Sequence, residues 1–334
     1  MSNMRNYLIL FSIFFCAASS AYAEGSLLPD AEPENKALSQ IASQLADPAL
    51  QADKAKLKGV CTDFSKRKAQ FPRGLSDDAE LYAGYCSELL GDYKSALAAY
   101  EKSLAAKANN PTALFRSGLA LAQLERCSEA ANRFKEVIWR LSEQSYEPRY
   151  HLAKCQVTLE QPAAAAKSLK LALEENPQYV PALKLRNDLR RKALPELKDA
   201  KIAAGIRDKM IIDYRTIVAQ HPEDTDSKAE LARLLISGSD PVFDAEKLKE
   251  AQTIAAELAQ KTEFKNAEFA RLYFDVLLAR RYLEEAKGVI KRALEETPSD
   301  PRLLEASLQL EIELGAELAA REQEQQEEQS EQLR

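Results

Sequence analysis

The sequence predicts an all-α chain built as a stack of antiparallel helical hairpins, and three observations lead to this fold class. Apolar residues recur at helical spacing almost throughout, while the two-residue alternation of strands never persists. The chain also repeats itself at a nearly constant interval. At 334 residues it exceeds the usual size of one compact domain, yet no Ser/Gly-rich linker divides it. Stacked repeats account for all three observations.

The repeat is clearest where residues 77–110 align with residues 111–144. A third copy follows directly with a shift longer by one position, and part of it recurs near the end of the chain. The matched positions are Gly84, Gly118 and Ala153; Ala96, Ala130, Ala165 and Ala286; Tyr100, Phe134, Leu169 and Ile290; Ala172 and Ala293; Pro177 and Pro298. Small residues at fixed positions let two helices approach closely, so the copies predict hairpins with the same internal packing.

This pattern resembles the tetratricopeptide repeat, a helical hairpin of about 34 residues with a small residue in its first helix and Ala-x-x-x-aromatic in its second. The resemblance covers residues 77–190 and 267–314 and implies a right-handed α-solenoid. It is incomplete, because Glu80, Leu114, Arg149 and Ala270 occupy the position of the family's tryptophan. Phe274 also replaces the small residue of the last copy, which predicts less regular packing there.

Residues 1–23 have the pattern of a secretory signal. Arg5 precedes an apolar run from Leu8 to Ala18, and a small-x-small motif ends at Ala23. The run is shorter than the roughly 20 residues that span a bilayer, so we expect cleavage before Glu24 and no stable membrane insertion afterwards. The expected location is the bacterial periplasm, with secretion as the alternative.

The remaining elements follow in order along the chain. Asp47 and Pro48 predict a helix start, as cap and first-turn residue, for a helix that runs to about Gln70. Gly91-Asp92-Tyr93 predicts the turn of the first hairpin. The expected organisation is 1–23 signal peptide, 24–36 flexible leader, 37–76 N-terminal helical pair, 77–190 repeats, 191–266 divergent helical hairpins, 267–316 C-terminal repeat and capping helix, and 317–334 Glu/Gln-rich tail.

Four cysteines follow the signal segment, and an even number in an exported chain suggests disulfides. The repeat resemblance makes the helices that carry Cys61 and Cys86 direct neighbours, and likewise those of Cys127 and Cys155. We therefore predict bridges Cys61–Cys86 and Cys127–Cys155. The alternative is four buried thiols, because free cysteine packs like a small hydrophobic residue.

Proteins of the tetratricopeptide type bind peptides or partner helices on the concave face formed by the first helix of every hairpin. Positions around the small-residue position share that helix face. They are Leu81, Tyr82, Tyr85, Phe115, Arg116, Leu119, Tyr150, His151 and Lys154. Together they predict a groove with aromatic anchors and local positive charge, suited to a segment with apolar and acidic residues. The alternative is that these aromatic residues belong to the core.

Composition and motifs disfavour several classes of function. With 52 acidic and 46 basic residues the net charge is −6, and no basic stripe for nucleic acid is visible. The cysteines and the two histidines, His151 and His221, lack the spacing of a metal site or of a nucleophile with its base. We expect no catalysis, no metal and no cofactor.

The favoured function is a protein-binding scaffold or assembly factor of the bacterial cell envelope. Its partner would be a peptide segment or helix held in the concave groove. One alternative is a self-associating structural protein. Another is the accessory platform of a cell-wall lytic enzyme, although such enzymes need a separate catalytic domain that the repeats leave no room for.

Overall fold

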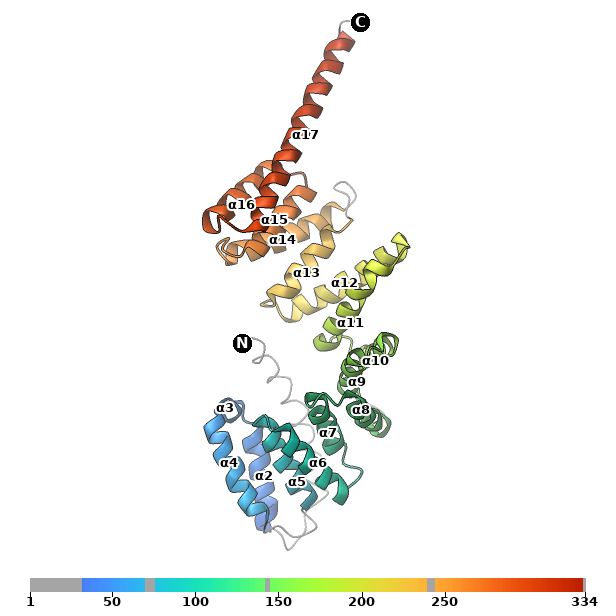
Figure 1. Cartoon of the computed structure of the whole chain (residues 1–334), viewed down its shortest axis with the longest axis vertical. Helices are drawn as coiled ribbons and strands as arrows, with labels where there is room; N and C mark the ends of the chain where they lie inside the picture. Colours follow the sequence, from blue (N-terminus) through green and yellow to red (C-terminus); the bar gives the residue numbers. More distant parts are fainter. Residues whose placement is uncertain (1–31, 70–75, 142–144, 239–243, 333–334) are drawn as a thin grey trace. The chain divides into compact units, whose positions relative to one another are not determined.

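The computed structural model describes residues 32–69, 76–141, 145–238 and 244–332, and every regular element in these ranges is a helix (Figure 1). The all-α prediction is confirmed. The predicted signal peptide lies outside the described residues, as does most of the predicted leader. In the described ranges, no helix is both long and apolar enough to cross a membrane.

The chain divides into two compact units, Met1–Pro177 and Gln178–Arg334. In the first unit a group of N-terminal helices is followed by three hairpins. Its helices are α2 (Glu32–Ala46), α3 (Pro48–Ala52), α4 (Lys54–Lys68), α5 (Ser76–Leu89), α6 (Tyr93–Ala106), α7 (Pro111–Gln123), α8 (Cys127–Leu141), α9 (Tyr146–Thr158) and α10 (Pro162–Glu175). Consecutive helices pack side by side, so α5 and α6, α7 and α8, and α9 and α10 form the hairpins that the repeat predicts.

The second unit contains three further hairpins and a long last helix. Its elements are α11 (Val180–Ala193), the short 3₁₀ helix η2 (Leu194–Glu196), α12 (Ala200–Gln220), α13 (Thr225–Ile236), α14 (Ala245–Lys261), α15 (Ala267–Ala279), α16 (Leu283–Glu296) and α17 (Pro301–Gln332). The stretch predicted as divergent hairpins therefore consists of helices joined by turns wherever it is described. The predicted Glu/Gln-rich tail continues α17, so it is helical rather than irregular up to Gln332.

Several helices begin at residues with a clear capping role. Asn110 accepts hydrogen bonds from the backbone N–H groups of Thr112 and Ala113, and Pro111 takes the first turn of α7, where no N–H is needed. Asp92 caps α6 in the same way through the N–H of Ser95. These two caps fix where α6 and α7 start.

Four hairpin turns share one backbone geometry. Gly91, Glu125, Glu160 and Arg281 have φ of 84°, 62°, 56° and 60°, the left-handed region that favours glycine. In each turn the next residue donates its N–H to a carbonyl near the helix end, as Arg126 does to Leu121 at 2.9 Å. The spacing of these four residues equals the spacing of the repeat copies, so the turn recurs even where glycine does not.

The two glycines of the repeat pattern allow close helix approach. A Cβ built on Gly84 would lie 2.5 Å from the ring of Tyr100, and one on Gly118 would lie 2.7 Å from the ring of Phe134. Both aromatic rings are fully buried and belong to the second helix of the same hairpin. The small-residue position therefore faces the helix that completes the hairpin, as the sequence pattern predicts.

The N-terminal helices differ from the prediction in one detail. Asp47 caps α3 through the N–H of Ala49, as expected. The single predicted helix is broken at Asp53, which ends α3 and caps α4 through the N–H of Lys56. The predicted flexible leader is also too long, because α2 already begins at Glu32.

One of the two predicted disulfides is formed. Cys61 on α4 is bonded to Cys86 on α5, with their Cα atoms 5.6 Å apart. Cys127 and Cys155 are buried free thiols, so the second predicted bridge is wrong for this structure. The two thiols are nevertheless neighbours, and burial together with the nearby Cys127 raises the pKa of Cys155 to about 12. A high thiol pKa suppresses the thiolate that disulfide formation requires.

Candidate functional site

The structure places most of the predicted groove residues inside the first unit rather than on its surface. The buried members are Leu81, Tyr85, Phe115, Arg116, Leu119 and Tyr150, of which even the most exposed, Leu119, is only 9 % exposed. Tyr82 and His151 are partly buried, and Lys154 is exposed. The prediction that these nine side chains line an open groove therefore needs correction. The nine residues do lie on the first helices of their hairpins. Five of the six buried ones, however, are apolar or aromatic core residues.

Arg116 is the clearest case of a predicted binding residue with internal partners. Its Nη1 donates to Glu88 Oε1 at 3.1 Å, and its guanidinium lies 3.8 Å from the centre of the Tyr85 ring. The hydroxyl of Tyr100 donates to the other oxygen of Glu88 at 2.5 Å. Burial lowers the pKa of Arg116, but Glu88 and the two tyrosines outweigh it and raise that pKa overall. The network ties α5, α6 and α7 together.

His151 is held by aromatic rings on α9 and its neighbours. Its ring centre lies 5.6 Å from that of Phe115, 5.7 Å from that of Phe134 and 5.0 Å from that of Tyr150. Burial, with a smaller contribution from Lys154, lowers the pKa of His151 to about 3. The imidazole is therefore neutral at physiological pH and packs as an aromatic group.

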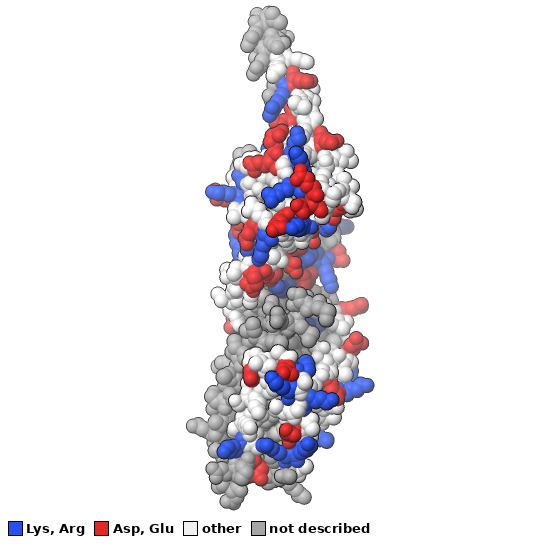
Figure 2. Space-filling view, turned by 90° about the vertical axis from the view of Figure 1, so that its left-hand side faces the viewer, with Lys and Arg blue, Asp and Glu red and all other residues white. Residues whose placement is uncertain are grey.

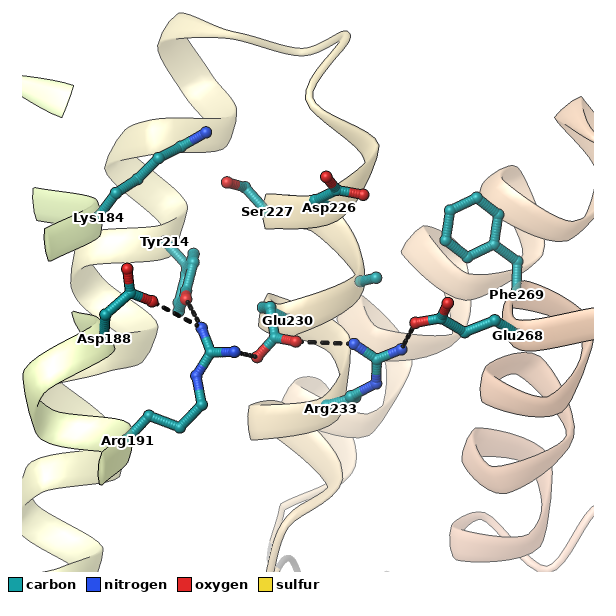
Figure 3. A pocket seen from close by; sticks show the side chains of 11 residues that line it. Lys184, Asp188, Arg191, Tyr214, Asp226, Ser227, Glu230, Arg233, Glu268 and Phe269 are labelled. Atoms are coloured by element: carbon teal, nitrogen blue, oxygen red, sulfur yellow. Dashed lines mark hydrogen bonds and ion pairs between the residues drawn. The ribbon is translucent and has the colours of Figure 1, made fainter. Parts of the chain in front are cut away.

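The second unit offers a more open site on the same kind of helix. A pocket of about 260 Å³ is lined by the first helices of three successive hairpins, α11, α13 and α15, with Tyr214 from α12. Figure 3 shows charged side chains from these helices pointing toward one another across the pocket. Its lining residues are Lys184, Asp188, Arg191, Tyr214, Asp226, Ser227, Ala229, Glu230, Arg233, Glu268 and Phe269.

A ladder of alternating charge crosses this pocket, and we call it the charge ladder: Asp188, Arg191, Glu230, Arg233 and Glu268. Arg191 contacts Asp188 Oδ1 at 3.3 Å and Glu230 Oε2 at 3.5 Å. Arg233 contacts the other oxygen of Glu230 at 2.8 Å and reaches Glu268 on α15. The ladder thus connects three first helices through two shared arginines.

The charge ladder is accessible to a ligand. The side chains of Arg191 and Asp188 are 48 % and 56 % exposed, and those of Arg233 and Glu268 are 37 % and 52 % exposed. Pairs this exposed contribute little to stability, because water competes for each charge. They can therefore exchange an internal partner for a charged group of a bound chain at small cost.

Tyr214 anchors one end of the charge ladder. Its hydroxyl accepts a hydrogen bond from Arg191 Nη2 at 2.9 Å, and burial raises the pKa of Tyr214 despite the nearby arginine. The hydroxyl stays protonated at physiological pH, so it offers a hydrogen-bond donor beside the guanidinium. The pocket lining contains no cysteine or histidine. Its chemistry suits recognition by charge and hydrogen bonds.

Sequence reasoning missed this pocket because it extended the groove only as far as Lys154. One signal was present: Asp188 and Arg191 are three residues apart on α11, and Glu230 and Arg233 repeat that acid-to-arginine spacing on α13. Residues three apart share a helix face. What the sequence did not show is that these two faces meet, because the repeat pattern is weak between residues 191 and 266.

A second hollow, of about 580 Å³, lies in the first unit between α4, α5 and α6. Four lysines line it beside the disulfide: Lys58, Lys66, Lys68 and Lys102. Lys68 is paired with Glu80 at 2.7 Å. This hollow has a larger volume than the charge-ladder pocket, but it lies on a single hairpin and the helix before it. It is therefore the weaker candidate.

Charge is mixed over the surface. Figure 2 shows lysine and arginine interspersed with aspartate and glutamate on the face that it presents, rather than gathered into a field of one sign. Within the described ranges, no group of three or more histidine, cysteine, aspartate or glutamate side chains is placed to hold a metal ion.

Comparison by sequence finds no matching family model and no matching curated protein. Comparison by structure finds several similar proteins. The C-terminal part of a tetratricopeptide-repeat protein from Cytophaga hutchinsonii matches with a TM-score of 0.56 at 11 % identity, over 77 % of this chain and 96 % of that one. The Naa15/Naa10 structure bound to HypK-THB matches with a TM-score of 0.51 at 13 % identity, over 94 % of this chain and 58 % of that one.

A tetratricopeptide-repeat protein from Parabacteroides merdae is also similar, with a TM-score of 0.47 at 18 % identity over 83 % of this chain and 99 % of that one. At such identities the comparisons concern the fold. The comparison with the Cytophaga hutchinsonii protein agrees with the features that the chain itself shows, namely the regular repeat interval, the glycine-to-aromatic contacts and the repeated hairpin turn. The chain has the fold of a tetratricopeptide-repeat protein.

Proposed function

We propose that the chain is a non-catalytic scaffold that holds a segment of a partner protein against the charge ladder. The observation that carries the proposal is the pocket formed by α11, α13 and α15, the first helices of three successive hairpins. The charge-ladder side chains that cross the pocket alternate in sign and are between 25 % and 56 % exposed. Such a surface recognises a chain that also carries both charges.

The expected ligand is an extended segment with at least one acidic and one basic side chain. A carboxylate of the segment would compete with Glu230 for Arg191 or Arg233, since planar guanidinium groups bind carboxylates with two hydrogen bonds. A lysine or arginine of the segment would then pair with the Glu230 carboxylate that has lost its arginine partner. The small-residue lining at Ser227 and Ala229 leaves room for the backbone of the segment.

We further propose that this scaffold works in the bacterial cell envelope. Two features support that location: the signal pattern of residues 1–23 and the Cys61–Cys86 disulfide. Disulfides persist in oxidising compartments such as the periplasm and are rare in the cytosol. Fractionation of cells that express the full chain tests this proposal: the protein should appear in the periplasmic fraction with Glu24 as its first residue. Recovery from the cytosol with residues 1–23 attached would contradict it.

Site-specific photo-cross-linking tests the binding site. A cross-linking amino acid replaces Asp188 or Asp226, which line the pocket, and in a matched control it replaces Lys287, an exposed residue of the second helix α16. The same partner protein should be captured in envelope extract from both pocket positions and not from the control. Capture at equal yield from Lys287 would refute the proposed site.

A charge variant completes the test. Arg191→Gln with Arg233→Gln removes both arginines of the charge ladder, and with them the guanidinium groups that would bind a carboxylate of the partner. The cross-linking yield at Asp226 should therefore fall at least about ten-fold. Circular dichroism checks that the helices remain. Unchanged capture by the folded double variant would show that the charge ladder does not bind the partner.

A further inference from the structure

The last helix of the second unit has two apolar faces, and only one of them is covered by described residues. Leu303, Ala306 and Leu310 are buried against α15 and α16. The opposite face carries four exposed apolar side chains, which we call the outer stripe of α17. They are Leu304, Leu308, Ile312 and Leu318, exposed by 50 %, 60 %, 65 % and 61 %.

The outer stripe forms one continuous surface. Leu304, Leu308 and Ile312 are four residues apart and therefore lie one above another on the helix. Gly315 extends the same face, and a Cβ built on it meets nothing within 4 Å. From Leu304 to Leu318 the stripe is about 21 Å long, or about four helical turns. Figure 1 shows α17 continuing past α15 and α16.

The repeat explains what this face is built to contact. In α5 and α7 the small-residue position, Gly84 or Gly118, faces the second helix of the same hairpin. The shift that carries Gly84 onto Gly118 also carries Phe274, the equivalent position of α15, onto Leu308. The centre of the outer stripe is thus the position at which earlier first helices receive their second helix. No described helix occupies that place on α17.

The chain also shows that a large residue at this position is compatible with a hairpin. Phe274 is fully buried in one cluster with Ala286 and Ile290 of α16, the second helix of its hairpin. Leu308 can be covered in the same manner by a helix that presents a small residue opposite it. A helix is therefore the ligand whose shape fits.

The charge around the stripe selects the kind of helix. α17 carries nine glutamates and two arginines. Both arginines already have partners, Arg302 in Asp300 and Arg321 in Glu317. Glu305 and Glu311 lie beside the stripe and are exposed. A second copy of α17 would bring like charges together, whereas a basic helix would meet opposite ones.

We propose that the outer stripe of α17 docks a basic amphipathic helix of another protein, which takes the place of a second hairpin helix. Leu304, Leu308 and Ile312 bind its apolar face, and the glutamates beside them select lysine and arginine on its edges. This surface is separate from the charge-ladder pocket, so the two proposals can fail independently.

Selection from a peptide library tests the proposal with the full chain as bait. The library displays helical peptides of roughly four turns, about as long as the stripe. Their positions are random in charge and hydrophobicity, so the library itself does not favour basic or amphipathic sequences. We expect the enriched peptides to be basic and amphipathic. Their binding, measured by fluorescence anisotropy with the synthetic peptides, should weaken at least ten-fold for Leu308→Glu.

Ile212→Glu is the matched control, because Ile212 is also 60 % exposed but lies on α12. It adds the same charge and should leave peptide affinity within two-fold of the unchanged chain. Equal loss for both variants, binding that survives Leu308→Glu, enrichment of acidic or neutral peptides, or no enrichment would each overturn the proposal. So would a concentration-dependent dimer that Leu308→Glu abolishes in light scattering, which would assign the stripe to a second copy of this chain.

Discussion

The buried pair Arg116–Glu88 permits a sharp prediction about what holds the first unit together. Replacing Arg116 by methionine keeps most of the apolar stem of the side chain and removes its charge. The side chains of Arg116 and Glu88 are only 7 % and 12 % exposed, so the variant leaves a carboxylate with little access to water. In the described network, the Glu88 carboxylate then keeps one hydrogen bond, which the Tyr100 hydroxyl donates.

The expected cost follows from this geometry. Breaking a buried ion pair by removing one partner lowers the free energy of unfolding by about 3–5 kcal/mol, because an uncompensated charge remains inside. Arg116→Met should fall in that range. The double variant Arg116→Met with Glu88→Gln has no buried charge and keeps an acceptor for Tyr100, so it should recover about 2 kcal/mol or more of the loss.

Urea unfolding of the full chain measures these differences. Circular dichroism follows all helices and is the readout, because Trp139, the only tryptophan of the sequence, is 78 % exposed on α8 and its fluorescence would report unfolding only weakly. Arg126→Met is the surface control, because the pair Arg126–Glu129 is about half exposed and should contribute less than about 1 kcal/mol. A loss for Arg116→Met no larger than that of the control, or no recovery in the double variant, would refute the reasoning.

Three further predictions concern single groups in the structure. Burial raises the pKa of Glu147 from 4.5 to about 7, even though the charge of Arg116 opposes the shift. The folded chain therefore disfavours the charged form of Glu147. As a result, the free energy of unfolding falls as the pH rises from about 4.5 to 7. Glu147→Gln should therefore match the unchanged chain at pH 4 and exceed it by up to about 3 kcal/mol at pH 8, as urea unfolding at both pH values would show. Gly118→Ala should lower the melting temperature by crowding the ring that its Cβ would meet, whereas Gly288→Ala, with open space in a helix interior, should raise stability by about 0.5–1 kcal/mol. Reducing the bond between Cys61 and Cys86 should cost roughly 3 kcal/mol. Alkylation of the unreduced, unfolded chain that begins at Glu24 should label two of its four cysteines, not all four or none.

The sequence predicted those parts of the fold that depend on local chemistry or on the repeat. The turn at Gly91, the cap at Asp47 and the close approach at Gly118 all follow from residue types at fixed spacing, and the structure contains each of them. The break at Asp53 was missed because Asp53 caps a helix that begins immediately after another ends, and periodicity alone reads across such a short interruption.

The site was harder to predict than the fold. Spacing identified which residues share the first-helix face of α5, α7 and α9, but it could not show that this face is closed by packing. Arg116 illustrates the limit: its charge suggested a ligand, yet Glu88, 28 residues earlier in the chain, supplies the counter-charge. The charge-ladder pocket lies in the second unit, and its central helix α13 falls within residues 191–266, where no repeat copy was recognised from the sequence.

The hairpin turns have a practical consequence for this chain. Glu125 and Glu160 are exposed and adopt a backbone conformation that costs a residue with a side chain roughly 1 kcal/mol more than glycine. The helices on either side must hold these turns in place against that cost. Replacing Glu125 or Glu160 by glycine should therefore raise the free energy of unfolding, because glycine adopts this backbone conformation without the cost. Neither substitution touches the charge ladder or the outer stripe. A chain reinforced in this way would let destabilised variants of the first unit, such as Arg116→Met, be studied while they remain folded.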